Sequence, residues 1–171
     1  MLHITYPIIQ AGMAGAVTTP ELVVAGGIMD GRGLMAALAL GAAGVQMGTA
    51  FLTCTESATH PAHQQAIFDS NDQSTVLTNV FSGRYARGIY NTFIKEMESF
   101  ESDMPAYLIQ NMLTADIRKT AGAQHNQEYM SLWAGQASPL ARKESAAALI
   151  ERTIAEADER IGRLLKRTEQ I

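Results

Sequence analysis

Gly26-Gly27-Ile28-Met29-Asp30-Gly31-Arg32-Gly33 is the stretch that decides the fold of this chain, and Gly44-Val45-Gln46-Met47-Gly48-Thr49-Ala50-Phe51 follows one helix later. Each stretch combines an apolar strand with a glycine turn. Glycine lacks a Cβ atom, so its backbone can approach an anion closely and can adopt positive φ. Two such turns at consecutive strand ends predict one phosphate held by backbone N–H groups. The alternative interpretation is purely structural: the two glycine turns allow the strand ends to pack closely, and no ligand is bound.

The surrounding segments predict a parallel βαβ unit over Leu22–Phe51. Strands are expected over Ile4–Gln10 and Val45–Phe51, with a short helix over Leu34–Leu40 between them. The cues conflict at Leu22–Ala25: Thr19, Pro20 and Glu21 are typical of a helix start, but the four apolar residues suit a buried strand. Because one short segment carries both the start of a helix and a buried strand, we interpret residues 22–27 as an apparent join between two parts of the sequence.

The remainder of the chain reads as mostly helical. The expected elements are a helix from Pro61 to about Asp69, a short strand over Thr75–Thr78, and helices over Tyr90–Ser99, Ala106–Ala121 and Gln127–Trp133. A final helix is expected to start at Ser138-Pro139. An apolar stripe on this helix is predicted at Ile150, Ile154, Ala157, Ile161 and Leu164.

Five segments carry a family resemblance. They are Pro7–Ala14, Ala25–Gly33, Gly44–Phe51, Phe81-Ser82-Gly83-Arg84-Tyr85-Ala86-Arg87-Gly88 and Ser131-Leu132-Trp133-Ala134-Gly135-Gln136. Together they resemble the nitronate monooxygenases, also called 2-nitropropane dioxygenases. The resemblance covers nearly the whole chain.

The resemblance implies a TIM-type barrel, an FMN cofactor, and oxidation of alkyl nitronates by O₂ to carbonyl compounds and nitrite. It also implies the cofactor-binding residues, with Met13 near the flavin ring and the glycine turns at its phosphate. These residues are Met13, Ala14, Gly26, Gly27, Gln46, Met47, Gly48 and Thr49. Structural roles are the alternative to cofactor contact: Met13 could be a flexible side chain that fills the core, and Gln46 could be a polar side chain at a strand end.

The family's catalytic histidine, which lies in a Gly-Gly-His segment, has no counterpart in this sequence. The catalytic residue is therefore unknown. We interpret His60 as a helix-start residue, His63 as solvent-facing and His125 as a loop residue. Arg84 and Arg87 fit either an anion-attracting loop or a solvated basic loop.

Length limits the architecture. A complete eight-unit barrel usually takes about 250 residues, and this sequence has 171. We therefore expect an α/β fold: an incomplete TIM-type (β/α) barrel remnant with a helical C-terminal part. The expected division is a partial FMN-binding barrel over residues 1–105 and a helical segment over 106–171.

The amino-acid composition indicates which classes of binding partner and which cellular compartment to expect. The net charge is −4 and no basic stripe stands out, which argues against nucleic-acid binding. No apolar run is long enough to span a membrane and no signal peptide is evident, so we expect a cytoplasmic protein. The single cysteine, Cys54, suits a reducing compartment, and no spacing predicts a metal site.

Three functions remain open at this stage. The first is nitronate monooxygenase activity with FMN, reduced or lost here, acting on a small-molecule nitronate and O₂. The second is a related flavin-dependent enoyl-acyl-carrier-protein reductase, which would need a nicotinamide site. The third is a non-catalytic remnant that binds a phosphate ligand or a helical partner. Because a partial barrel leaves strand edges open, we also expect self-association.

Overall fold

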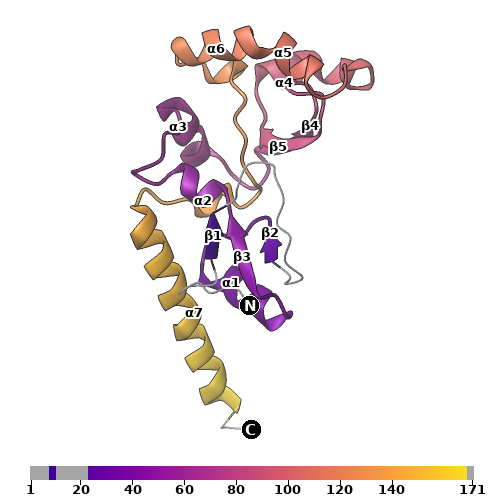
Figure 1. The fold of residues 1–171 in the computed structure, drawn as a ribbon. Coiled ribbons are helices and arrows are strands. Elements are labelled where there is room, and N and C mark those ends of the chain that lie inside the picture. The colour runs from indigo at the N-terminus through magenta and orange to yellow at the C-terminus, as the bar shows by residue number, and fades with distance from the viewer. Residues whose placement is uncertain (1–7, 11–22, 169–171) are drawn as a thin grey trace. The chain divides into compact units, whose positions relative to one another are not determined.

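The computed structural model describes residues 8–10 and 23–168, which form two compact units (Figure 1). Unit 1 combines the chain up to Ser57 with the chain from Leu140 onward, and unit 2 is Ala58–Pro139. The grouping places its boundaries after Ser57 and Pro139, and the expected division into a barrel part over residues 1–105 and a helical segment over 106–171 stays a prediction. The chain leaves unit 1 after its third strand and returns with the final helix, so the C-terminal segment belongs with the glycine turns.

Unit 1 contains a parallel three-stranded sheet in the order β1-β3-β2. The strands are β1 (Ile8–Gln10), β2 (Val23–Ala25) and β3 (Gly44–Met47). The strand interpretation of the ambiguous segment before Gly26 is confirmed for β2, whereas the proposed helix start before it lies outside the described residues. The expected extension of β3 to Phe51 is wrong, because Thr49–Leu52 forms the short helix α2.

Helix α1 (Gly31–Ala39) starts three residues earlier than expected because Asp30 caps it. The Asp30 carboxylate accepts from the N–H groups of Arg32 at 2.9 Å and Gly33 at 3.2 Å. The helix gives way to Gly41, whose φ of +93° is a conformation that glycine adopts without strain.

Helix α7 (Ala146–Thr168) packs against α1 within unit 1. The expected start at Ser138 is wrong: Ser138–Leu140 forms the 3-10 turn η3, and the Ser145 hydroxyl accepts from the Ala148 N–H at 3.1 Å. The buried stripe also differs from the predicted one. It consists of Leu149, Thr153 and Ala157, while Ile161 is exposed.

Unit 2 begins with helix α3 (Pro61–Asp69) and an antiparallel hairpin of β4 (Thr75–Thr78) and β5 (Ala86–Ile89). The predictions of α3 and β4 are confirmed. Strand β5 was not predicted, because Gly88 weakens the strand pattern. Its glycine is explained by close packing, since a Cβ atom there would lie 3.0 Å from the Trp133 ring.

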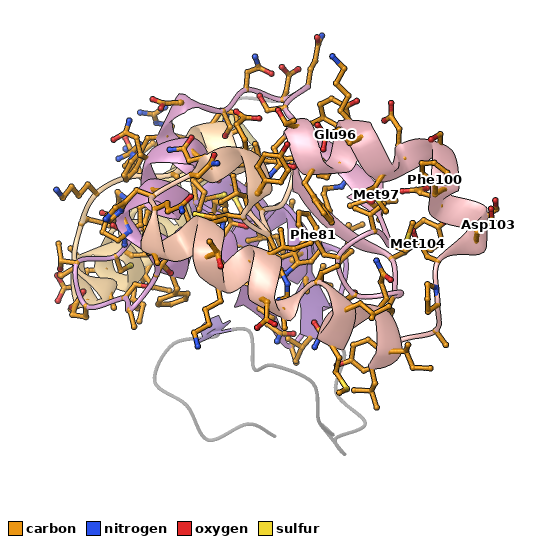
Figure 2. All side chains as sticks on the ribbon, turned by 90° about the horizontal axis from the view of Figure 1, so that it is seen from above. Phe81, Glu96, Met97, Phe100, Asp103 and Met104 are labelled. Carbon is orange, nitrogen blue, oxygen red and sulfur yellow. The ribbon has the colours of Figure 1, made fainter. Side chains whose placement is uncertain are left out.

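Helical segments complete unit 2: α4 (Thr92–Met97), η1 (Glu98–Asp103), α5 (Ile109–Leu113), α6 (Ala115–Ala123) and η2 (Gln127–Tyr129). The helix expected over 106–121 is thus divided in two, and the one expected over 127–133 is a single 3-10 turn. Phe81 stacks on Phe93 with ring centroids 4.7 Å apart at the core of this unit. Met97 packs on the same cluster, whereas Phe100 is exposed (Figure 2).

The α/β class is therefore observed. Within the described part of the chain, the parallel sheet has three strands and no closed barrel is formed. Among these same residues, no helix combines the length and apolar character needed to cross a membrane.

Candidate functional site

The two glycine turns follow neighbouring parallel strands. The register pairs Val24 with Val45 and Ala25 with Gln46. Parallel strands end at the same edge of a sheet, so the turn at Gly26-Gly27 and the turn at Gly48 leave that edge beside each other. This is the arrangement expected of the candidate phosphate site.

The backbone at this edge is open to solvent. Gly26 and Gly27 have φ of +100° and +71°, a region that favours glycine. A Cβ atom built on Gly26 would meet nothing within 4 Å. Both residues and Gly48 are exposed. Bare, accessible peptide groups therefore lie where a phosphate would have to approach.

The neighbouring side chains differ in accessibility. Met47 is buried at 1% exposure, so its side chain belongs to the core. Gln46 and Thr49 are half-buried. The other two predicted cofactor residues, Met13 and Ala14, lie outside the described residues.

The start of α1 already has its own anionic partners. The N–H of Gly31 donates to Oε2 of Glu156 at 3.0 Å, and the next two N–H groups donate to Asp30. Burial alone would raise the pKa of Asp30, but the Arg32 guanidinium and the two amide donors outweigh it and hold that pKa below its ordinary value. The first N–H groups of α1 therefore already have acceptors. Backbone N–H groups for a phosphate at this edge would have to come from the preceding glycine turn, which is exposed.

Sequence reasoning missed the contribution of α7 to this region. Burial by itself would raise the pKa of Glu156. The Gly31 N–H and the guanidinium groups of Arg152 and Arg142 have the opposite effect and together outweigh burial, so the pKa lies below its ordinary value. Arg152 in turn donates to Glu144 at 2.6 Å. No local signal links Gly31 to a residue 125 positions later.

The described histidines all belong to unit 2. His60 is the helix-start residue that we expected: its Nδ1 accepts from the Ala62 N–H at 3.1 Å at the start of α3. His125 is an exposed loop residue, also as expected, and its ring centroid lies 4.9 Å from that of His60.

The solvent-facing interpretation of His63 is wrong. Its Nε2 lies 3.0 Å from the carbonyl oxygen of Trp133. A carbonyl only accepts, so Nε2 carries the proton that it donates. Burial is the main cause that lowers the pKa of His63, which keeps the ring neutral at neutral pH.

The two motif segments of unit 2 serve its packing. Arg87 donates to the Thr75 carbonyl at 3.1 Å, while Arg84 is exposed. Gly83 has φ of +76°, and a Cβ there would collide with the backbone of Pro105. Trp133 lies edge-on to Phe81, with ring centroids 5.5 Å apart. Among the residues that the structure describes, no group of acidic, histidine and cysteine side chains is arranged to hold a metal ion.

Comparison with known proteins agrees with these motifs. The sequence model of the nitronate monooxygenase family matches residues 22–156. A probable nitronate monooxygenase of Staphylococcus saprophyticus is 49% identical over 142 residues, which cover 83% of this chain and 40% of that protein. The chain belongs to the nitronate monooxygenase family, whose name denotes oxidoreductases.

Solved structures show the same relationship. A nitroalkane oxidase from Streptomyces ansochromogenes superposes with a TM-score of 0.78 and 39% identity, covering 84% of this chain and 41% of that one. FabK from Thermotoga maritima gives a TM-score of 0.74 and 30% identity, covering 88% and 48%. The chain thus spans less than half the length of each of these relatives.

Proposed function

We propose that this chain is an FMN-binding part of the nitronate monooxygenase fold, derived from a TIM-type barrel. The observation that carries the proposal is the parallel register of β2 and β3, which brings two exposed glycine turns to one sheet edge. In FMN the phosphate is the group that such a backbone suits, because N–H groups without a covering Cβ can surround its oxygens.

The chain's own residues would hold the cofactor in a defined way. Gly26, Gly27, Gly48 and Thr49 would supply backbone N–H groups to the phosphate. Gln46, half-buried on β3, offers a polar side chain one strand residue before the turn. Asp30 and Glu156 would stay outside the phosphate contact, since their carboxylates already accept from α1.

When bound, FMN would supply the redox chemistry by which nitronates are oxidised by O₂ to carbonyl compounds and nitrite. A preformed nitronate has already lost its α-proton, so binding it asks for no base. A neutral nitroalkane must lose that proton, and a positioned base typically contributes a factor of about 10² to 10⁴. The sequence lacks the family's Gly-Gly-His segment, so we infer that the substrates here would be preformed nitronates.

The likeness to FabK supports a second candidate, flavin-dependent reduction of an enoyl thioester. The two candidates differ in co-substrate, because enoyl reduction consumes the reductant NADPH and nitronate oxidation consumes the oxidant O₂. A non-catalytic phosphate-binding remnant is the third candidate. A cytoplasmic location is a further proposal, based on composition and on the single Cys54.

A visible absorption spectrum of the purified protein tests the proposal directly. We expect flavin absorption that stays with the protein through gel filtration and is released as FMN on denaturation. NADPH consumption with an enoyl thioester would favour the second candidate. A protein that neither carries flavin nor takes it up from solution would contradict both flavin candidates.

A further inference from the structure

The N-terminus of α1 is occupied by two carboxylates of the chain itself. Glu156 of α7 accepts from the Gly31 N–H at 3.0 Å, and Asp30 accepts from the N–H groups of Arg32 and Gly33. The first N–H groups of a helix have no partner within the helix, and together with the helix dipole they attract anions such as phosphate. In α1 this anion position is therefore already filled, although it directly follows the glycine turn of the candidate phosphate site.

Glu156 is held at this position by the packing of its helix. A Cβ atom on Gly31 would collide with the backbone of Ala157, the next residue of α7. Leu149, Thr153 and Ala157 are buried, which anchors α7 in unit 1. The Glu156 carboxylate therefore stays beside the first turn of α1 when a ligand approaches the sheet edge.

The charge of Glu156 is balanced by arginines of unit 1. Its Oε1 lies 3.1 Å from Nη1 of Arg152 and 3.8 Å from Nη2 of Arg142. Arg152 also pairs with Glu144 at 2.6 Å. The charges of these two carboxylates and two guanidinium groups cancel, so the set offers no net positive charge to a phosphate. Removal of the Glu156 charge alone would leave the set with one positive charge.

We propose that Glu156 is a positioning residue that keeps a bound phosphate on the two glycine turns and off the N-terminus of α1, at a cost in affinity. This inference rests on the proposed function, because it takes the phosphate of FMN as the ligand. Glu156 occupies the Gly31 N–H, which a phosphate would otherwise use, and its charge repels a phosphate held at Gly27 and Gly48.

The glycine turn and the carboxylate are close enough for this repulsion to be measured. Gly27 and Gly31 are four residues apart, so their Cα atoms lie within about 15 Å of each other. Coulomb's law for a doubly charged phosphate at about 10–15 Å from one carboxylate in water gives roughly a two- to fourfold loss of affinity. Salt removes this effect, because the Debye length is about 30 Å at 0.01 M ionic strength but only about 3 Å at 1 M.

FMN titration at low and high ionic strength tests the electrostatic part. Glu156→Gln keeps an oxygen that accepts from the Gly31 N–H but removes the charge. Its Kd for FMN should be roughly two- to fourfold lower than that of the wild type at about 0.01 M salt, and equal to it at about 1 M. Glu159→Gln is the matched control on the same helix, because its carboxylate is 62% exposed and pairs with Arg163. Its effect should be less than half as large.

Amide NMR with inorganic phosphate tests where the anion binds, without a flavin. In the wild type and in Glu156→Gln, phosphate should shift the N–H signals of Gly27 and Gly48 and leave that of Gly31 unchanged. Glu156→Ala frees the Gly31 N–H, so in this variant phosphate should shift the Gly31 signal as well. The dispersion of the same spectra shows whether each variant is folded, and Glu156→Ser provides a second variant without the carboxylate if Glu156→Ala is not.

The results that would overturn the inference differ from those that would overturn FMN binding. Weaker or equal FMN binding by Glu156→Gln at low salt would show that Glu156 acts only through packing. A Gly31 shift in the wild type, or none in the variants without the carboxylate, would contradict its role in placing the anion. If phosphate shifts Gly31 only in those variants and shifts Gly27 and Gly48 in every protein, but none of the proteins binds FMN, the proposed function fails and the inference holds for phosphate alone.

Discussion

The backbone N–H of Gly31 donates to the carboxylate of Glu156 at 3.0 Å, across 125 residues of sequence. This contact fastens α7 to the first turn of α1, directly after the glycine turn of the candidate phosphate site. A Cβ atom on Gly31 would collide with the backbone of Ala157, so the two helices meet at van der Waals contact.

Removal of the carboxylate should therefore destabilise unit 1. We expect Glu156→Ala to lower the free energy of unfolding by about 1–3 kcal/mol, since a charge-assisted hydrogen bond and two guanidinium contacts are lost. Urea titration measures this. Glu159→Ala, which removes an exposed pair with Arg163 on the same helix, should cost about 0.5 kcal/mol or less. Equal losses would contradict the role given to Glu156.

Acid should remove the same contribution. The pKa of Glu156 is lower in the folded chain than its ordinary value of about 4.5, so its stabilisation is present above that pH and lost as the pH falls through the lower folded pKa. The difference in unfolding free energy between the wild type and Glu156→Gln should shrink on acidification below about pH 4.5. The pKa of Asp30 is also lowered in the folded chain. Asp30 is present in both the wild type and Glu156→Gln, so its contribution cancels in the difference between them. A pH-independent difference would contradict this prediction.

The close contact at Gly31 gives a second stability prediction. Gly31→Ala should cost roughly 2–3 kcal/mol, because a methyl group must displace packed backbone. Gly162→Ala on α7 is the control, since its Cβ would meet nothing within 4 Å and alanine favours a helix by about 1 kcal/mol over glycine. Thermal unfolding should shift in opposite directions for the two variants.

In unit 2, His63 should be required for the environment of Trp133. His63→Phe leaves the Trp133 carbonyl without its donor, at a cost of about 1–3 kcal/mol. The chain has one tryptophan, so its fluorescence reports on this segment alone and should shift. His125→Asn, at an exposed position with φ of +53° that asparagine tolerates, should leave both properties near wild type. An unchanged emission spectrum in His63→Phe would show that the hydrogen bond does not fix this segment.

These contacts show where sequence reasoning succeeds. The parallel strands around Gly26 and Gly48 and the start of α3 at Pro61 follow local patterns, and the structure confirms them. The early start of α1 was missed although Asp30 is a standard capping residue. Glu156 and the half-buried His63 were missed for another reason: their partners are distant in sequence, and periodicity reports only on near neighbours. Strand β5 was missed because Gly88 weakens its strand pattern.

The start of α7 and the break between α5 and α6 show a different limit. Ser138 and Ser145 offer equal capping chemistry, and tertiary contacts with Glu56, whose carboxylate accepts from the Ala146 N–H at 3.0 Å, favour the later start. The cofactor residues were assigned by family resemblance. The structure brings the two described glycine turns to one edge, but places the Met47 side chain in the core.

Substrate form tests the consequence of the missing Gly-Gly-His segment. With FMN supplied, nitrite should be released from a separately prepared alkyl nitronate and should not be released from the neutral nitroalkane. Free FMN is the blank. Equal, protein-dependent rates on both forms would show that another residue acts as the base, and His63→Ala and His125→Ala would then be the first variants to assay.

Titration of the purified chain with FMN, followed by flavin fluorescence, tests the central claim most directly. We predict saturable binding by the wild type, strong loss in Gly48→Val, where a β-branched side chain blocks the phosphate approach, and near-normal binding in Gly162→Val, where open space accepts the side chain. Equal binding by all three proteins, or no binding by the wild type, would contradict a phosphate site built from the two glycine turns.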